Sequence, residues 1–270
     1  MPMTSQMLPL YAYGDQIITG DDIVSALQTA GIKAGDVILV HSKVSAFGKF
    51  LLSDRQLFFF ELEQALRRSV EADGTLVMPT FSYSFCNDEV FDVEKTSSTV
   101  GVLTEHFRTQ PGVARTKHPI FSVAISGRHR DDFINASKDS FDGGSIFGQL
   151  HRVNAKMVFF GASFESCTFV HYIEQAHGIP YRYLKSFTGI IRERGQESTE
   201  TVTYNVRFLD RDVVTVLEKF ENHLLEKGFM KRVKIGSGVI EVISCEDAYR
   251  EGMKLLDQDI YFFLQHPVEV

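Results

Sequence analysis

Two repeating patterns of hydrophobic and polar positions run along the first two thirds of the chain. Apolar runs at 37–41, 75–81, 121–126 and 156–162 have the length and composition of buried strands. Between these runs, apolar residues recur every three or four positions and caps stand at the segment ends, which predicts helices at 21–32, 52–74, 99–109, 145–152 and 167–177. Strands that alternate with helices over residues 36–178 predict an α/β fold with a doubly wound, mostly parallel sheet.

Beyond residue 180 the pattern changes to that of an antiparallel hairpin arm. Residues 184–195 and 198–209 alternate in polarity and flank a polar turn at Gly195–Gln196, which predicts a β-hairpin. Further elements are expected after this arm: a helix near 211–227, a strand pair around 231–243 and a helix at 245–256.

We expect a single domain, because the chain shows neither an internal repeat nor a low-complexity linker. This domain would cover residues 1–270. Its core would comprise about 17–183 and 210–264, and the hairpin at about 184–209 would be an arm or lid on that core.

Composition and charge exclude several classes of protein. The chain is 44% hydrophobic and 23% charged with a net charge of −7, which is ordinary for a soluble globular protein and gives no footprint for nucleic acid. No apolar run approaches the roughly 20 residues of a membrane span, and the N-terminus lacks a signal-peptide pattern. Cys86, Cys167 and Cys245 are far apart and odd in number, so we expect no disulfide framework and a cytoplasmic protein. The sequence leaves a homo-oligomer open.

Polar loops follow three of the predicted strands. In an open α/β sheet, ligands bind beyond the carboxyl ends of the strands. This rule selects HSKVSAFG at 41–48, PTFSYSF at 79–85 and GASFESCTFVH at 161–171, which are rich in hydroxyl groups, glycine and histidine. A further segment, RTKHPIFS, precedes a strand. It is either a plain polar loop or a source of Arg115 for an anion and of His118 or Ser122 for a cleft.

His171 has several chemical interpretations. It has metal-ligand spacing with Glu174 and His177, but the two histidines lie six positions apart, about 120° around a helix, so we expect no metal. Cys167 lies four residues earlier and would form a Cys–His pair, which also needs an oxyanion hole. A general base needs a group that orients it, and Glu105 or Glu174 would serve. An ordinary helix histidine is the remaining alternative.

Five segments, in order along the chain, give a more specific indication. They are GDVILVHSKVSAFG, GTLVMPTFSYSF, VGVLTEHFR, GVARTKHPIFSVAISG and SIFGQLHRVNAKMVFFGASFESCTFVHYIEQAHGIPYR. In this order they resemble the motifs of the aminoglycoside 3-N-acetyltransferase family, which transfers acyl groups from coenzyme A to amines. The resemblance extends from about Ile17 to Leu264. It implies the fold of that family and an acyl-CoA co-substrate without a metal.

The resemblance also implies roles for single residues. His171 would be the base that removes the proton of the amine, and Glu105 would orient it. Thr168 would lie in the catalytic loop and Thr80 near the thioester, whose oxygen needs hydrogen-bond donors during the reaction. The rest of the coenzyme side would be lined by His41, Ser42, Lys43, Ser45, Phe47, Gly48, Arg115, His118 and Ser122.

The charges of the hairpin arm give an indication of the charge of the acceptor molecule. The arm is not acidic, as a polycationic acceptor would require, and arginines suit phosphate groups. We therefore expect an anionic acceptor, such as a nucleotide-linked amino sugar of a polysaccharide pathway, bound with the help of Glu174, Arg192 and Arg207. The alternatives are an aminoglycoside, as in antibiotic resistance, and a coenzyme A-binding module without turnover; in either case the arginines would be solvated strand residues. The charged residues of the arm are Lys185, Arg192, Arg194, Arg207, Glu193, Glu197 and Glu200.

Overall fold

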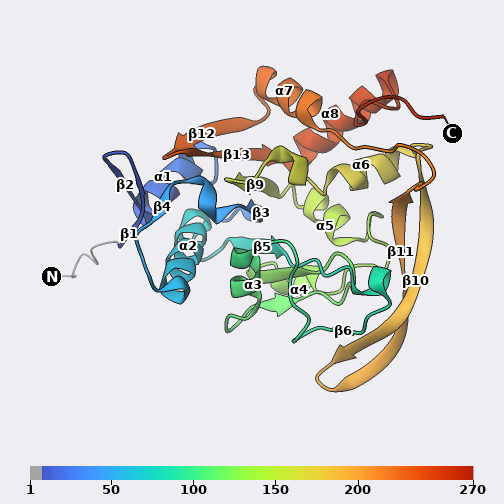
Figure 1. The fold of residues 1–270 in the computed structure, drawn as a ribbon, viewed down its shortest axis with the longest axis horizontal. Coiled ribbons are helices and arrows are strands. Elements are labelled where there is room, and N and C mark those ends of the chain that lie inside the picture. The colour runs from blue at the N-terminus through green and yellow to red at the C-terminus, as the bar shows by residue number, and fades with distance from the viewer. Residues whose placement is uncertain (1–7, 270) are drawn as a thin grey trace.

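A mixed seven-stranded sheet forms the centre of the computed structural model, which describes residues 8–269 (Figure 1). The three strands in the middle of the sheet run parallel, and the strands on both sides run antiparallel to their neighbours. In spatial order the strands are β12 (Lys231–Ile235), β13 (Gly238–Ser244), β9 (Lys156–Phe160), β3 (Val37–Ser42), β5 (Thr75–Pro79), β8 (Val123–Gly127) and β7 (Ala114–Arg115).

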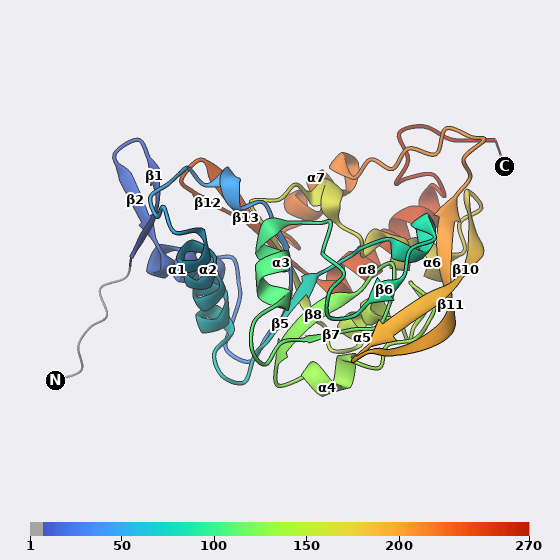
Figure 2. The same cartoon turned by 60° about the horizontal axis from the view of Figure 1, so that its bottom comes forward.

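Both faces of this sheet are buried, because alternate residues of the central strands enter two different cores. In β3, Val37 and Leu39 belong to one hydrophobic cluster, and Ile38 and Val40 belong to the other. The strand period of two places successive side chains on opposite faces. The predicted doubly wound α/β fold is therefore confirmed. One face is covered by α1 (Gly20–Thr29), α2 (Arg55–Val70) and α3 (Val102–Arg108), and the other by α5 (Ile146–Arg152), α6 (Val170–His177), α7 (Glu218–Glu226) and α8 (Cys245–Gln258) (Figures 1 and 2).

The predicted arm is a long hairpin of β10 (Arg182–Glu193) and β11 (Gln196–Arg207). Its strands pair from Glu193 opposite Gln196 to Arg182 opposite Arg207, so the hairpin begins two residues earlier than predicted. Figure 2 shows it at one end of the molecule, where β6 (Phe91–Asp92) pairs with β10 in parallel. The base of the hairpin thus brings Arg182 and Arg207 beside α6.

Several parts of the chain differ from the predicted pattern. The helix expected from residue 211 begins only at Glu218, because residues 213–216 are a run of Val and Thr, whose branched side chains favour extended backbone. Near the N-terminus an additional small sheet forms, which the period-based analysis did not predict. It consists of β1 (Pro9–Tyr13), β2 (Gln16–Thr19) and β4 (Lys49–Phe50). The remaining short elements are η1 (Val44–Ala46), η2 (Ser84–Asn87), α4 (Arg130–Phe133) and η3 (Phe164–Ser166).

Two further properties concern cysteines and membrane spans. All three cysteines are free thiols; Cys167 and Cys245 are buried, and Cys86 is exposed. No helix within residues 8–269 combines the length and apolar character needed to cross a bilayer.

We expect Phe160→Ala to lower the free energy of unfolding by about 3–5 kcal/mol, because the change leaves a cavity in a close-packed core. The Phe160 side chain is fully buried in β9, with its ring centroid 4.5 Å from that of Phe47. Phe60→Ala is the matched control, since Phe60 is 45% exposed on α2 and its loss should cost no more than about 0.5 kcal/mol. Urea unfolding curves measure both values, and equal costs for the two variants would contradict the packing described above.

Candidate active site

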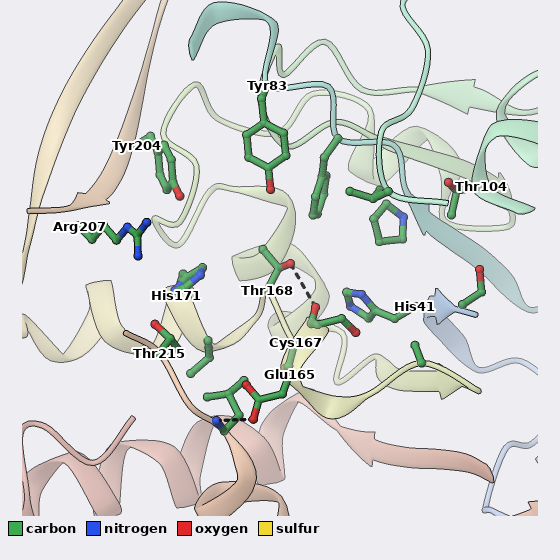
Figure 3. Close-up of a pocket in the computed structure, with 18 of the residues that line it drawn as sticks. His41, Tyr83, Thr104, Glu165, Cys167, Thr168, His171, Tyr204, Arg207 and Thr215 are labelled. Atoms are coloured by element: carbon green, nitrogen blue, oxygen red, sulfur yellow. Dashed lines mark hydrogen bonds between the residues drawn. The ribbon is translucent and has the colours of Figure 1, made fainter. Parts of the chain in front are cut away.

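A cavity of about 580 Å³ opens beyond the carboxyl ends of the three parallel strands β3, β5 and β9 (Figure 3). This is the edge of the sheet that the sequence predicts for ligand binding. His41 and Ser42 reach it from the end of β3, and the loop from Glu165 to His171 reaches it after β9. The base of the hairpin and residues 213–217 complete its walls.

His171 lines this cavity and is oriented by a carboxylate of its own helix. Its Nδ1 lies 2.7 Å from Oε2 of Glu174, one turn later in α6. A carboxylate only accepts hydrogen bonds, so Nδ1 carries the proton and Nε2 keeps its lone pair. The ring of Phe141 packs edge-on against the imidazole at 5.5 Å between centroids and limits its rotation. The arrangement is that of a neutral imidazole base at the surface of a cavity.

Glu174 is the centre of a buried polar cluster. Its side chain is 0% exposed, Oε1 accepts a hydrogen bond from the hydroxyl of Tyr181 at 3.0 Å, and Nε of Arg182 lies 2.8 Å from Oε2. The carboxylate is not part of the cavity lining, and the expected contact of Glu174 with substrate stays a prediction. Arg182 and the two hydrogen bonds hold the pKa of Glu174 below its usual value despite burial.

The pKa of His171 is also perturbed. Burial lowers it, and the charge of Arg182 lowers it further, while Glu174 acts in the opposite direction. The net direction is downward, which keeps the imidazole neutral at pH 7. A neutral imidazole is the form that accepts a proton.

The loop between β9 and α6 is shaped by Gly161 and carries Thr168 to the cavity. Gly161 has a φ of 68°, and a Cβ on it would lie 2.8 Å from the carbonyl oxygen of Lys43, so the two strand-end loops approach each other only with glycine there. Thr168 lines the cavity between His41 and His171 in Figure 3, and its hydroxyl makes one long hydrogen bond of 3.4 Å to the carbonyl of Ser166. Thr168 therefore offers a donor to a bound group.

Cys167 does not form a reactive pair with His171. Burial raises the pKa of its thiol to about 12, and the sulfur lies 3.9 Å from that of Met157 in the core. A thiolate is the nucleophilic form of cysteine, and it is not populated here at neutral pH. The Cys–His alternative is therefore excluded.

His41 and Ser42 form the other side of the cavity, away from His171. The His41 ring stacks on Phe159 with 5.2 Å between centroids, and burial lowers its pKa to about 4. Nε2 of His41 and Oγ of Ser42 are buried and have no hydrogen-bond partner in the described part of the chain. Buried polar atoms normally have partners, so these two atoms at the cavity wall are available for a further hydrogen bond.

Glu105 is not the carboxylate that orients His171. Its two oxygens accept hydrogen bonds from the guanidinium of Arg108 at 2.5 and 2.6 Å, and Oε2 also accepts from the backbone N–H of Ser98 at 2.7 Å. Glu105 does not line the cavity. It instead fixes the turn that precedes α3, and the structure corrects the predicted pairing to His171 and Glu174.

Thr80, Arg115 and Ser122 form a buried bracing cluster rather than a ligand surface. Nε of Arg115 donates to the hydroxyl oxygens of Thr80 at 3.2 Å and Ser122 at 3.1 Å, and NH2 donates to the carbonyl of Thr80 at 2.7 Å. Thr80 and Ser122 are fully buried. Their polar atoms hold the end of β5 against β8, and the predicted contacts of these three residues with the coenzyme stay predictions.

Three further residues that were predicted to bind the coenzyme make structural contacts, and their role as ligands stays a prediction. Nδ1 of His118 accepts from the backbone N–H of Phe121 at 3.1 Å, and its Nε2 lies 3.3 Å from the hydroxyl of Ser140. Phe47 is buried in the core, and a Cβ on Gly48 would lie 2.5 Å from the carbonyl oxygen of Ala12. None of the three lines the cavity; their contacts shape the loops around it.

The two predicted substrate arginines of the hairpin have different surroundings. Arg192 forms an ion pair with Glu197 at 2.5 Å on the exposed part of the arm and does not line the cavity, and its contact with substrate stays a prediction. Arg207 does line it. Lys43 and Ser45 are exposed next to the His41 loop, and their contacts with the coenzyme stay predictions.

Several cavity residues were not singled out from the sequence. Among the described residues, no group of three His, Cys, Asp or Glu side chains is placed to hold a metal ion. Most of the polar cavity residues that the sequence analysis did not select are tyrosines or threonines, and one is an exposed carboxylate, Glu165. The aromatic character of PTFSYSF and the Tyr-Arg pair at the start of β10 were the local signals. The residues concerned are Tyr83, Thr104, Glu165, Arg182, Tyr204 and Thr215.

Comparison with known proteins agrees with this geometry. The sequence profile described as aminoglycoside 3-N-acetyltransferase matches residues 39–257. Aminoglycoside N(3)-acetyltransferase IV of Salmonella sp. is 28% identical over 255 residues, which is 92% of this chain and 90% of that protein. Among solved structures, a mutant of the acetyltransferase AAC(3)-IVa in complex with a gentamicin superposes with a TM-score of 0.74 and 25% identity over 92% of this chain and 91% of the other. AAC-IIIb in a binary complex with CoASH superposes with a TM-score of 0.75 and 21% identity over 93% and 99%.

The profile match spans most of the chain, from β3 to α8, and includes the strand-end loops that build the cavity. The chain therefore belongs to the aminoglycoside 3-N-acetyltransferase family.

Proposed function

We propose that the protein transfers the acetyl group of acetyl-coenzyme A to an amine of an aminoglycoside, with His171 as general base. The observation that carries the proposal is the contact between His171 and buried Glu174, which leaves Nε2 of the histidine unprotonated at a cavity beyond the parallel strands. Family membership supplies the reaction class. A coenzyme-binding module without turnover would have no use for this oriented base.

The reaction follows from the protonation state of His171. The lone pair of the acceptor nitrogen attacks the thioester carbonyl carbon, an N–C bond forms, and the C–S bond then breaks to release the coenzyme thiolate. The nitrogen loses its proton to Nε2 of His171, which can return it to the sulfur. Glu174 stabilises the imidazolium that forms, and positioned proton transfer of this kind is worth roughly 10²–10⁴-fold in rate. Atoms and charges balance without a metal or a covalent enzyme intermediate.

Thr168 is the side-chain donor best placed for the thioester oxygen. That oxygen gains negative charge in the transition state, and fixed donors directed at it stabilise the charge. Thr80, the other hydroxyl considered from the sequence, is fully buried and bonded to Arg115 and Ser122. Thr168 lines the cavity, so it takes this role in the proposal.

His41 and Ser42 are proposed to hold the pantetheine part of the coenzyme. Their buried polar atoms lack partners, and pantetheine contains amides that both donate and accept hydrogen bonds. The depressed pKa of His41 keeps its ring neutral, so one ring nitrogen donates and the other accepts. Lys43, exposed beside them, would reach a phosphate.

An aminoglycoside is the acceptor that the relatives support. AAC(3)-IVa has been crystallised with a gentamicin and with apramycin. The nucleotide-linked amino sugar expected from the sequence rested on the basic residues of the hairpin arm, Lys185, Arg192, Arg194 and Arg207, and of these only Arg207 lines the cavity. Glu165, exposed in the cavity wall, would pair with one ammonium group of an aminoglycoside.

His171→Ala should lower kcat for gentamicin or apramycin acetylation by roughly 10²–10⁴-fold, because the base is lost. The affinity for coenzyme A should change little, since His41 and Ser42 are intact. Thiol release measures turnover, and calorimetry with coenzyme A measures binding. His177→Ala is the matched control, because His177 lies on the same helix, contacts Asp257 at 3.1 Å and does not line the cavity. Full turnover by His171→Ala would rule out the general-base assignment, and coenzyme binding without any turnover by the wild type would support the binding module instead.

We expect kcat/KM to increase with pH in the acidic range, with the midpoint of the increase below about 6.5. Activity needs neutral His171, and the pKa of this residue is lowered. Glu174→Gln removes the charge that raises this pKa, so the midpoint should move to still lower pH while kcat falls. A pH–rate profile over pH 4.5–9 measures both effects, and a thermal unfolding curve checks the variant, since Arg182 loses its partner. An unchanged midpoint would show that another group titrates.

A further inference from the structure

One wall of the cavity is rich in hydrogen-bond donors that the reaction described above does not use. Tyr83 follows β5, and Tyr204 and Arg207 belong to β11, so two separate segments supply it. Figure 3 shows the three side chains together, on the opposite side of the cavity from His41. We call this set of three residues the donor wall. All three side chains line the same cavity.

The donors of this wall are free to bind a ligand. Neither phenol hydroxyl has a hydrogen-bond partner in residues 8–269, and Arg207 uses one N–H for the carbonyl of Val213 at 3.1 Å. Within the same range no carboxylate lies at ion-pair distance from Arg207. A guanidinium has five N–H donors in a planar fork, so the remaining ones suit a carboxylate or a phosphate. Burial raises the pKa of Tyr83 to about 12 and raises that of Tyr204, so both phenols stay protonated as donors.

The charges of this half of the cavity leave one cation without compensation. Arg182 is matched by Glu174, which is buried against it. Glu165 is the exposed carboxylate of the lining, and its Oε1 already accepts a hydrogen bond from the backbone N–H of Leu217 at 2.8 Å. Arg207 is therefore available to attract an anionic group of a ligand on its side of the cavity.

We propose that the donor wall binds an anionic oxygen group, a phosphate ester or a carboxylate, on the acceptor, so that the enzyme acetylates amino sugars carrying such a group. The inference rests on the acetyl transfer proposed above and extends its acceptor class beyond aminoglycosides. The acceptor amine lies at His171 while the anion lies at Tyr83, Tyr204 and Arg207. Because the coenzyme also carries phosphates, the test has to separate an acceptor anion from a coenzyme anion.

The test compares acceptors that differ in charge but share an amino sugar. Glucosamine, glucosamine 6-phosphate and muramic acid supply a neutral ring, a phosphate and a carboxylate, and kanamycin supplies a polycation. With saturating acetyl-coenzyme A, kcat/KM from thiol release should be about tenfold higher or more for one of the two anionic sugars than for glucosamine, since charge-assisted hydrogen bonds are strong. The preferred anion identifies the group, phosphate or carboxylate.

Arg207→Gln should reduce that ratio to near one and increase kcat/KM for kanamycin relative to glucosamine. Tyr204→Phe and Tyr83→Phe should each reduce the ratio in part. Arg192→Gln is the matched control on the same hairpin, because Arg192 is paired with Glu197 outside the cavity, and its ratio should equal that of the wild type.

Two results would overturn the inference while leaving acetyl transfer intact. One is equal kcat/KM for neutral and anionic sugars in the wild type. The other is an increase in KM for acetyl-coenzyme A with every acceptor in Arg207→Gln, which would assign the arginine to the coenzyme. Absence of thiol release with all four amines, by contrast, would contradict the proposed function itself.

Discussion

The burial of Glu174 is the constraint on which the candidate active site depends. A carboxylate without access to water needs compensation by charge and by hydrogen bonds, or it does not stay ionised. Here the compensation comes from His171 on the same helix and from Tyr181 and Arg182 at the entry to the hairpin. The contacts of Tyr181 and Arg182 join α6 to the base of β10, and the contact with His171 fixes the tautomer of the histidine. The cluster around Glu174 therefore both stabilises the packing of α6 and orients His171 for proton transfer.

The mixed sheet explains where the cavity forms. Carboxyl ends of parallel strands meet at one edge, so β3, β5 and β9 bring three loops to the same place. The antiparallel strands on either side add supports at this edge: the β12–β13 turn bonds to Ala46 through Ser237, and the segment before β8 bonds to Ser82 through Pro119. The hairpin lines a further side of the cavity with Tyr204 and Arg207. Residues 213–217 precede α7, and four of them also line the cavity.

Many residues in the resembling motifs support the site without touching a ligand. Arg115 holds Thr80 and Ser122, His118 holds the turn before β8, and Glu105 holds the turn before α3. A sequence motif contains residues that shape a loop as well as residues that bind, and both kinds are polar. The distinction lies in whether the polar atoms already have partners, which is a property of the folded chain.

The sequence by itself determined the α/β fold, nearly all the central strands, the hairpin, the ligand-binding edge and the presence of His41, Ser42, Thr168, His171 and Arg207 there. Apart from Arg207, which was expected from the charges of the hairpin arm, these features follow from the period of apolar positions and from the rule for open sheets, both of which are local or topological. The tertiary structure decided which carboxylate pairs with His171, and it brought Tyr83 beside Tyr204 and Arg207. The grouping of Tyr83 with Tyr204 and Arg207 depends on contacts between segments that are far apart in the chain. The choice between Glu105 and Glu174 depends on Arg108 and Ser98, which form hydrogen bonds with Glu105. Spacing along the chain cannot show which polar groups are already satisfied, because satisfaction is decided only when the elements pack.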